Sequence, residues 1–348
     1  MQKYTSAAPL AVFRAFFGLM LLASTVRFVA MGWVRDLYID PQFFFPFFGF
    51  EFIRPLGQWT YILFVICGIS ALLVALGLWY RVASAVLFLS FTYIELMEKS
   101  TYLNHYYFVS LICFLLVFLP AHTMFSVDSR RNPALRSGQI PAWCIDSIRI
   151  MVCMLYFYAG LAKLNSDWLL HALPLKIWLP AKNDLPVIGP VFNLPETAYV
   201  FSWVGCIYDL SVGFLLWQPR TRPYAYASVV IFHLLTSLLF PIGMFPYIMI
   251  ITALIFFPAG FHQRIIDGVQ QLFSLQSAPA IFQARYRFRP WAGPIIYGIF
   301  TLFFLFQILF PFRYLRYPGE LFWTEEGYRF SWRVMLMEKA GYTQFTVR

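Results

Sequence analysis

Ionisable side chains within apolar segments are functional candidates by default, because they are costly to bury. In this sequence they are Arg14, Arg27, Glu95, Arg149, Lys163, Asp209 and His233. A further pair, Asn104 and His105, lies in the aromatic stretch Tyr102–Phe108 (YLNHYYF). An amide beside an imidazole offers a donor–acceptor pair that an aromatic belt at a membrane surface does not require. The stretch is therefore either an interface belt or part of a polar site.

A second stretch, Tyr156–Trp168 (YFYAGLAKLNSDW), contains Lys163 after a run of small residues. Apart from Lys99, Lys163 is the one lysine in or beside an apolar segment, where arginine supplies the other cations. A lysine in an apolar setting gives up its proton readily and can act as a base, which arginine cannot do. The alternative is a snorkelling lysine that extends its ammonium group to lipid headgroups. Both interpretations are open at this point.

A third stretch, Phe232–Tyr247, contains His233 and a Pro-Ile-Gly-Met-Phe-Pro break at Pro241–Pro246. A lone histidine in an apolar segment is more often a satisfied core residue than a catalyst. Non-helical backbone at membrane depth is tolerated where it is buried or lines a cavity. The break is therefore the stronger indication of a site.

The residue spacing does not indicate a disulfide framework, a metal site or a nucleic-acid-binding surface. The five cysteines form no CxxC pair and are interpreted as small apolar packing residues. No two of the five histidines are three to five residues apart, so no metal site is predicted. The net charge of +10 is not concentrated beside a soluble recognition module, which argues against nucleic acid as a partner.

The elements that hold these residues follow from composition. Of the 348 residues, 60% are hydrophobic and 12% are charged, against a usual charged share of about 25%. Stretches without Asp, Glu, Lys or Arg, each long enough to cross a bilayer, cover residues 55–80, 100–127, 223–263 and 290–312. Such continuous apolar runs exclude the alternating strands of a membrane β-barrel. The predicted fold class is an all-α polytopic membrane protein.

About nine transmembrane helices are predicted, at roughly residues 9–31, 58–79, 82–97, 104–120, 142–164, 198–218, 224–240, 245–259 and 292–312. This topology places most loop Lys and Arg residues on one face, against two acidic residues, Asp128 and Asp267. Because basic loops stay cytoplasmic, the N-terminus is predicted inside and the C-terminus outside. Asn104, Lys163 and the Phe240–Pro246 turn then share the outer face. This predicts one outward-opening site for a flat, lipophilic, weakly acidic ligand.

After Phe312 the composition becomes polar, aromatic and charged, and the final YTQFTVR alternates like a strand. Two domains are predicted, a transmembrane helical catalytic domain over residues 1–312 and a short extramembrane tail of β-like character over residues 313–348. A tail of about 36 residues cannot form an independent core. It therefore either packs on the outer face of the membrane domain or begins a larger C-terminal domain.

Six pieces of the chain form an ordered set of motifs: Phe91–Glu95, Tyr102–Tyr107, Tyr158–Trp168, Phe232–His233, Phe240–Phe245 and Gly327–Trp332. In this order they resemble the membrane domain of the vitamin K-dependent gamma-glutamyl carboxylases and their short bacterial homologues. No piece is diagnostic alone, whereas the ordered set is fairly specific. The resemblance implies a peptidyl-glutamate 4-carboxylase of the carbon–carbon lyase class, with vitamin K epoxidase activity.

In that family a lysine amine deprotonates vitamin K hydroquinone, and the product of its reaction with dioxygen removes a γ-proton from a peptidyl glutamate. Capture of carbon dioxide then gives γ-carboxyglutamate and vitamin K epoxide. The resemblance therefore implies vitamin K hydroquinone or menaquinol as cofactor, dioxygen and carbon dioxide as co-substrates, and no metal. It also implies a glutamate-containing peptide or protein as partner, besides membrane lipids.

The resemblance also assigns site residues. Lys163 matches the base, Asn104 a residue that holds the hydroquinone oxygen, and His105 one that assists proton handling. Tyr328 matches a tail tyrosine near the site. The implied cofactor-binding residues are His233, Phe245, Met249, Met335 and Tyr102.

Two positions depart from the family pattern. Ala162 stands where the animal enzymes have a second lysine, and Pro246 replaces an expected polar residue. Two other functions stay open, hydroquinone epoxidation without carboxylation and a non-catalytic quinone-binding or transport protein. The latter is disfavoured, because no inverted repeat with paired broken helices is visible. The family's short forms predict a bacterial inner membrane location, and the sequence does not set the oligomeric state.

Overall fold

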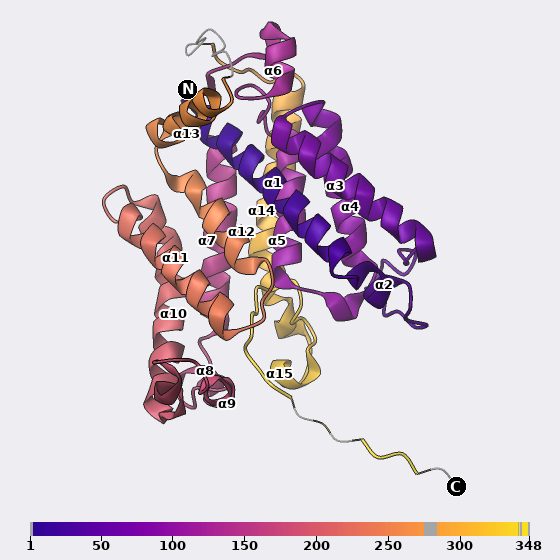
Figure 1. Cartoon of the computed structure of the whole chain (residues 1–348), viewed down its shortest axis with the longest axis vertical. Coiled ribbons are helices and arrows are strands. Elements are labelled where there is room, and N and C mark those ends of the chain that lie inside the picture. Colours follow the sequence, from indigo (N-terminus) through magenta and orange to yellow (C-terminus); the bar gives the residue numbers. More distant parts are fainter. Residues whose placement is uncertain (1–2, 275–283, 340, 342, 347–348) are drawn as a thin grey trace. The chain divides into compact units, whose positions relative to one another are not determined.

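The computed structural model describes residues 3–274, 284–339, 341 and 343–346, and most of the regular structure in this part of the chain is helical (Figure 1). The chain divides into two compact units. The first combines Met1–Cys153 with Phe214–Leu305, and the second combines Met154–Gly213 with Phe306–Arg348. Three long helices contribute residues to both units: α7 (Trp143–Ala162), α10 (Pro195–Trp217) and α14 (Ala292–Leu309).

Four helices of the first unit pack in sequence order: α1 (Ala8–Ala30), α3 (Thr60–Leu76), α4 (Tyr80–Leu96) and α5 (Asn104–Phe118) (Figure 1). Short elements join them: α2 (Trp33–Tyr38), η1 (Gly57–Trp59) and η2 (Lys99–Thr101). At Gly18, an added Cβ would lie 2.7 Å from the carbonyl oxygen of Ala71. The missing side chain therefore lets the backbones of α1 and α3 approach closely.

The turn between α3 and α4 depends on residues far away in the sequence. Gly77 has a φ of +64°, and an added Cβ there would lie 1.6 Å from Nη1 of the buried Arg14. The carboxylate of Asp128 accepts hydrogen bonds from the backbone N–H groups of Trp79 and Tyr80, at 2.9 and 2.8 Å. It thus caps the start of α4, where unpaired N–H groups and the helix dipole favour negative charge.

The first unit also contains a helical hairpin and a sharp bend. α11 (Arg222–Leu239) packs against α12 (Phe245–Ala253) across the intervening turn. α12 continues into η6 (Leu254–Phe256), and a 115° bend separates this pair from α13 (Ala259–Leu272). Pro246 lies in the first turn of α12 and Pro258 is the N-cap of α13, positions at which a missing N–H costs little. Both α12 and α13 contact α1.

The second unit surrounds the C-terminal half of α7 and most of α10. Between these helices lie α8 (Ser166–Leu169), α9 (Leu175–Trp178), η4 (Pro180–Lys182) and η5 (Gly189–Asn193). After α14 the chain forms η7 (Phe310–Arg316) and α15 (Leu321–Thr324). The hydroxyl of Tyr158 donates to the carbonyl oxygen of Ile308 at 2.7 Å, which joins α7 to the end of α14.

The predicted helical membrane fold is confirmed, whereas the predicted count of nine spans is not. Each of the nine predicted segments coincides with a helix, but five helices of the described residues are long and apolar enough to cross a membrane. They are Ala8–Ala30, Gly57–Leu76, Trp143–Ala162, Pro195–Trp217 and Ala292–Arg316, and the bent pair Phe245–Phe256 with Ala259–Leu272 would add a sixth. α4 and α5 have 17 and 15 residues, fewer than the roughly 20 that a bilayer requires.

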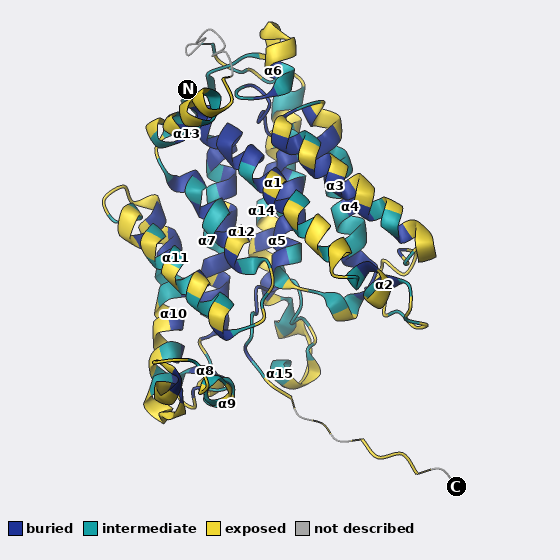
Figure 2. Ribbon diagram, in the orientation of Figure 1, coloured by how far each residue is buried: buried dark blue, intermediate teal, exposed yellow. Residues whose placement is uncertain are grey.

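Exposed residues recur along α3 (Figure 2), and many of their side chains are apolar. Ile62, Val65, Ile69 and Leu76 are between 45% and 56% exposed. Their spacing of three, four and seven residues places them on the same side of a helix. A continuous apolar face of this kind is unfavourable in water and suits contact with lipid.

The predicted β-like character of the tail is not found in its described residues, 313–339, 341 and 343–346. The two strands of the described chain are β1 (Tyr4–Ser6) and β2 (Gln139–Pro141), which pair with each other. The last short elements of the first unit are α6 (Val127–Arg131) and η3 (Pro133–Leu135). In YTQFTVR, residues 342, 347 and 348 lie outside the described residues, and residues 343–346 belong to no strand or helix. Alternation alone does not form a strand, because the backbone needs a hydrogen-bonding neighbour.

Candidate active site

The residues that the sequence singles out fall into two groups, one in each unit. The first unit contains Tyr102, Asn104, His105, His233, Phe245 and Met249. The second unit contains Lys163, Tyr328 and Met335. Each unit therefore has a constellation of its own.

In the first unit, Phe245 contacts two buried histidines. Its ring centroid lies 5.8 Å from that of His105 and 5.3 Å from that of His233. His233 meets the phenyl ring edge-on, at an interplanar angle of 84°. The exposed fractions of the histidines are 7% and 1%. The α11–α12 hairpin supplies His233 and Phe245, and the first turn of α5 supplies His105, so three helices build this cluster.

Two more predicted residues are the chain neighbours of this cluster. Asn104 precedes His105 and begins α5, and its Oδ1 accepts a hydrogen bond from the hydroxyl of Tyr102 at 3.0 Å. This bond orients the amide. Met249 follows Phe245 by one turn of α12 and is fully buried.

In the second unit, the ammonium group of Lys163 is held inside the protein. Lys163 directly follows α7 and is 7% exposed. Its Nζ lies 2.5 Å from Oδ2 of Asp209, on α10, and donates a second hydrogen bond to the carbonyl oxygen of Ala159 at 3.3 Å. The amine therefore faces α10. A snorkelling lysine would instead extend its amine away from the protein.

Close contact between α7 and α10 creates this ion pair. An added Cβ on Gly160 would lie 2.7 Å from the backbone nitrogen of Leu210, so the two backbones touch. Nearby, Nε1 of Trp168 donates to the carbonyl oxygen of Ser202 at 2.9 Å, and the Ser202 hydroxyl donates to the carbonyl of Trp168. These reciprocal bonds fix the indole ring, whose centroid lies 5.3 Å from Nζ of Lys163.

Asp209 is the residue that sequence reasoning missed as part of the site, although it stands among the ionisable residues of apolar segments. It lies 46 residues from Lys163 and on a different helix, so no spacing rule links the two. A usable signal is that a buried carboxylate requires a partner of opposite charge. Lys163 is a cation that directly follows the preceding long helix, α7.

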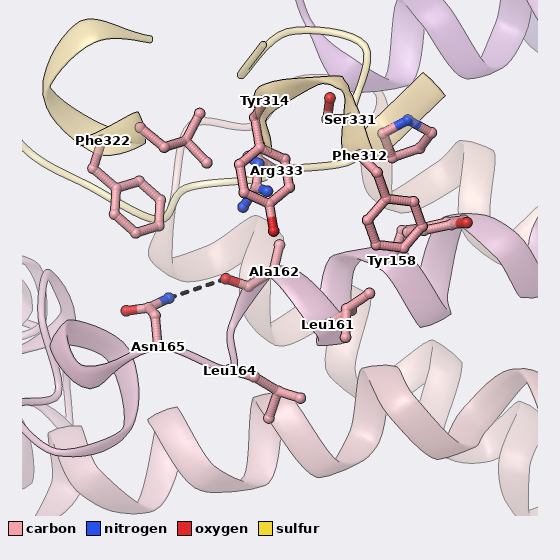
Figure 3. A pocket seen from close by; sticks show the side chains of 12 residues that line it. Tyr158, Leu161, Ala162, Leu164, Asn165, Phe312, Tyr314, Phe322, Ser331 and Arg333 are labelled. Carbon is pink, nitrogen blue, oxygen red and sulfur yellow. Dashed lines mark hydrogen bonds between the residues drawn. The ribbon is translucent and has the colours of Figure 1, made fainter. Parts of the chain in front are cut away.

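A pocket of about 190 Å³ lies in the second unit, and residues on both sides of Lys163 in the chain help to line it (Figure 3). The aromatic part of its wall consists of Tyr158, Phe312, Tyr314 and Phe322. The polar part includes Asn165, Ser331 and Arg333. The guanidinium of Arg333 lies 4.5 Å from the ring centroid of Tyr314, and burial lowers its pKa. The amide of Asn165 donates to the carbonyl oxygen of Ala162 at 3.0 Å, as the dashed line in Figure 3 shows.

Tyr328 and Met335 lie in the same unit but do not line this pocket. The Tyr328 ring centroid is 6.3 Å from that of Phe322, which is a wall residue. Burial raises the pKa of Tyr328 to about 12, so its hydroxyl keeps its proton at neutral pH. Met335 is partly buried and has a φ of +49°, in the left-handed region.

Two models of known protein families match most of the chain. Residues 2–261 match the family model described as HTTM domain, and residues 292–348 match the model described as vitamin K-dependent gamma-carboxylase, lumenal domain. No solved structure matches the chain. Both histidines, Lys163 and Asp209 fall in the first match, whereas Tyr328 and Arg333 fall in the second. The chain therefore belongs to the vitamin K-dependent gamma-carboxylase family.

Proposed function

We propose that this protein is a membrane enzyme that couples the oxygenation of a naphthohydroquinone, of the vitamin K or menaquinol type, to the carboxylation of a peptidyl glutamate. The observation that carries the proposal is the buried amine of Lys163, fixed between two helices by Asp209. Family membership supports a vitamin K-dependent carboxylase activity. When bound, the hydroquinone supplies the reducing equivalents that, with dioxygen, drive γ-proton removal from glutamate, and carbon dioxide becomes the new carboxyl group.

Lys163 has the role of the initiating base in this proposal. It accepts the proton of a ligand hydroxyl at Nζ, a transfer that lysine supports and arginine does not. Its amine is already oriented by Asp209 and by the carbonyl oxygen of Ala159. A base held in one geometry avoids part of the entropic cost of alignment with its ligand.

The cluster around Phe245 has the role of binding the flat ring of the ligand. Aromatic and thioether side chains make favourable contacts with an aromatic ring, and Phe245 with the buried Met249 supplies both kinds. His105 and His233 flank the phenyl ring and are almost fully buried, so this environment excludes water. Asn104 has the role of holding a ligand oxygen through its amide, and His105 that of moving protons during carboxylation.

The pocket of the second unit has the role of receiving the glutamyl side chain. Its volume of about 190 Å³ is smaller than the roughly 300–1,000 Å³ of pockets for drug-sized ligands. It therefore suits a group the size of one side chain. Arg333 in its wall provides the planar donors that match a carboxylate. The ring of Tyr328 lies 6.3 Å from that of the wall residue Phe322, so its hydroxyl belongs to the surroundings of the pocket.

We also propose a membrane orientation. The apolar helices support a multi-pass protein, and the match to a lumenal domain supports an extracytoplasmic position for residues 292–348. With nine spans, the N-terminus is cytoplasmic and the site faces the periplasm or lumen. A bacterial inner membrane fits this arrangement.

One assay tests the function and separates it from its two alternatives. Purified protein in lipid is supplied with vitamin K hydroquinone or menaquinol, labelled bicarbonate and a glutamate-rich peptide, with Lys163→Ala as the control. Formation of both epoxide and γ-carboxyglutamate is expected. Epoxide alone would identify a hydroquinone epoxidase. Quinol binding without either product would identify a binding or transport protein and overturn the proposal.

A further inference from the structure

The ion pair of Lys163 and Asp209 is more deeply buried than any other in the described chain. Its side chains are 9% and 7% exposed, and the acceptor and donor atoms are 2.5 Å apart. The remaining described ion pairs have side chains that are between 21% and 70% exposed. This pair therefore exists almost without water.

Stability does not explain such a pair. Removing two charges from water is costly, and two apolar side chains of similar volume often stabilise a protein equally well or better. Gly160 also packs directly against Leu210, so the two helices are in close contact beside the ion pair. A chemical role therefore accounts better for the pair than a structural one.

The hydrogen bonds from Nζ to described residues use two of its donors. An ammonium group has three N–H donors. One is directed to Oδ2 of Asp209 and a second to the carbonyl oxygen of Ala159. The third position is the one at which Lys163 can meet a ligand oxygen.

We propose that Asp209 is the positioning residue of the Lys163 amine and the final acceptor of the proton that this amine removes. The proposal rests on the proposed function, in which Lys163 is the initiating base. An N–H proton of Nζ first passes to Oδ2 of Asp209, which leaves a neutral amine. Rotation about the Cε–Nζ bond then turns the amine lone pair to the ligand, and the proton of the ligand hydroxyl passes to Nζ. One O–H bond breaks at the ligand and one O–H bond forms at Asp209. At the end Lys163 is again an ammonium group, and the negative charge has moved from the carboxylate to the ligand oxygen.

This relay avoids two costly species in a dry site. A neutral amine without a partner is never required, because the protonated carboxyl group of Asp209 stays hydrogen-bonded to Nζ. No unpaired cation is left in the protein, because the anionic ligand replaces the carboxylate as counter-ion. Asp209 therefore sets both the position of the amine and the destination of the proton.

The test combines turnover with an infrared measurement on the full chain in lipid. Asp209→Asn keeps the size and the hydrogen-bond acceptor but cannot take a proton. It is expected to bind the naphthoquinol and to lose epoxide formation at least about a hundredfold, the lower scale for loss of acid–base catalysis. Asp209→Glu restores a titratable carboxylate and is expected to exceed Asp209→Asn by about tenfold or more. Asp146→Asn is the matched control, because Asp146 is the acidic partner of another helical ion pair, with Arg149.

The infrared readout does not depend on turnover. Vitamin K hydroquinone is added without dioxygen, and the carbonyl band of a newly protonated carboxylic acid is recorded. In the wild-type chain this band is expected to appear and to shift when aspartate is carbon-13 labelled. It is expected to persist in Asp146→Asn and, in Asp209→Glu, to lose its sensitivity to labelled aspartate.

The outcomes separate the relay from the function. If Lys163→Arg loses epoxide formation while Asp209→Asn keeps it, Lys163 is the base and the relay is wrong. If Lys163→Arg turns over normally, Lys163 is not the base and the relay fails with it. If the wild-type chain forms neither epoxide nor γ-carboxyglutamate, the proposed function itself fails. If Asp209→Asn does not fold, the infrared band of the labelled wild-type chain and its change in Asp209→Glu are enough to test the relay. A wild-type band that is absent, or that Asp209→Glu leaves unchanged, would overturn the relay.

Discussion

Gly160 of α7 lies directly against Leu210 of α10. A Cβ added to Gly160 would lie 2.7 Å from the backbone nitrogen of Leu210 and 2.8 Å from its Cγ. Lys163 follows Gly160 by three residues, and Asp209 directly precedes Leu210. Because Gly160 has no side chain, the two helices come close enough for Lys163 and Asp209 to form their ion pair.

We expect Gly160→Ala to push α7 and α10 apart and to lengthen the Lys163–Asp209 contact. Overpacking of this kind destabilises proteins by about 1–3 kcal/mol, and epoxide formation should fall as well. Thermal unfolding and turnover in lipid measure the two effects. Gly205→Ala on α10 is the control, because an added Cβ there meets no described atom within 4 Å. Wild-type activity in Gly160→Ala would show that the helix contact does not set the site.

Lys163→Arg separates a base from a cation with a purely structural role. Arginine keeps the charge and a similar length but does not give up its proton at any usable pH. We expect normal folding and insertion, with epoxide formation reduced at least about a hundredfold. Lys176→Arg is the control, because Lys176 is a second lysine of the same unit, hydrogen-bonded to Tyr199. Normal epoxide production by Lys163→Arg would remove this residue from the reaction.

Chemical rescue provides an independent test of the same amine. Lys163→Ala lacks the base, and a small amine that diffuses into the space left should restore part of the rate. The rescue should grow with pH, because the fraction of free amine in solution grows. Epoxide formation is measured over a range of amine concentrations. Rescue that is equally strong with a quaternary ammonium salt would indicate a charge effect instead of proton transfer.

The Phe245 cluster predicts which ligands stabilise the protein. A naphthoquinol should raise the thermal unfolding temperature by mass action, and a water-soluble benzoquinone without a tail should do so less. Phe245→Leu should weaken the naphthoquinol effect, because the ring contact with His105 and His233 is lost. Phe88→Leu removes a different aromatic contact, with Phe114, and should leave the effect unchanged. Equal stabilisation of the wild-type chain by both ligands would argue against a lipophilic site.

The helices were predictable because their signal is local. Residues 55–80 and 290–312 contain no charged side chain, and each contains most of a long apolar helix, α3 and α14. The number of spans was less predictable, because a charge-free run does not reveal where a helix ends. Within the run 223–263, Pro246 lies in the first turn of α12 and Pro258 is the N-cap of α13. The chain bends by 115° between these two helices.

Sequence reasoning could single out only those site residues whose type is unusual in an apolar segment or matches a family motif. His105, His233 and Phe245 stood out by type, and the structure brings their rings together. The contact between Lys163 and Asp209 could not be predicted, since it joins residues 46 positions apart through the packing of two helices. That packing depends on Gly160, whose significance appears once its neighbour Leu210 is known.

The loop charges predict which side of the membrane each end occupies. A reporter fused after Arg136, in a segment that also contains Arg130 and Arg131, should read cytoplasmic. A reporter fused after Arg348 should read external if the chain crosses the membrane nine times. Paired alkaline phosphatase and fluorescent protein fusions measure this. Both reporters on the same side would refute the predicted nine spans, of which five lie between the two fusion sites.

Tyr328 predicts a pH dependence of stability above neutral pH. Burial raises the pKa of this phenol to about 12, whereas an unfolded tyrosine ionises near pH ~10. The folded state favours the neutral phenol, so the stabilisation is complete below about pH 10 and is lost as pH rises from about 10 to about 12. We therefore expect wild-type stability to fall more steeply over this window than that of Tyr328→Phe. Denaturant unfolding of the lipid- or detergent-bound chain at several pH values measures both slopes. Tyr224→Phe is the control, because Tyr224 is 78% exposed, and its curve should follow that of the wild type. Parallel curves for the wild type and Tyr328→Phe would mean that the Tyr328 hydroxyl is not buried in the folded protein.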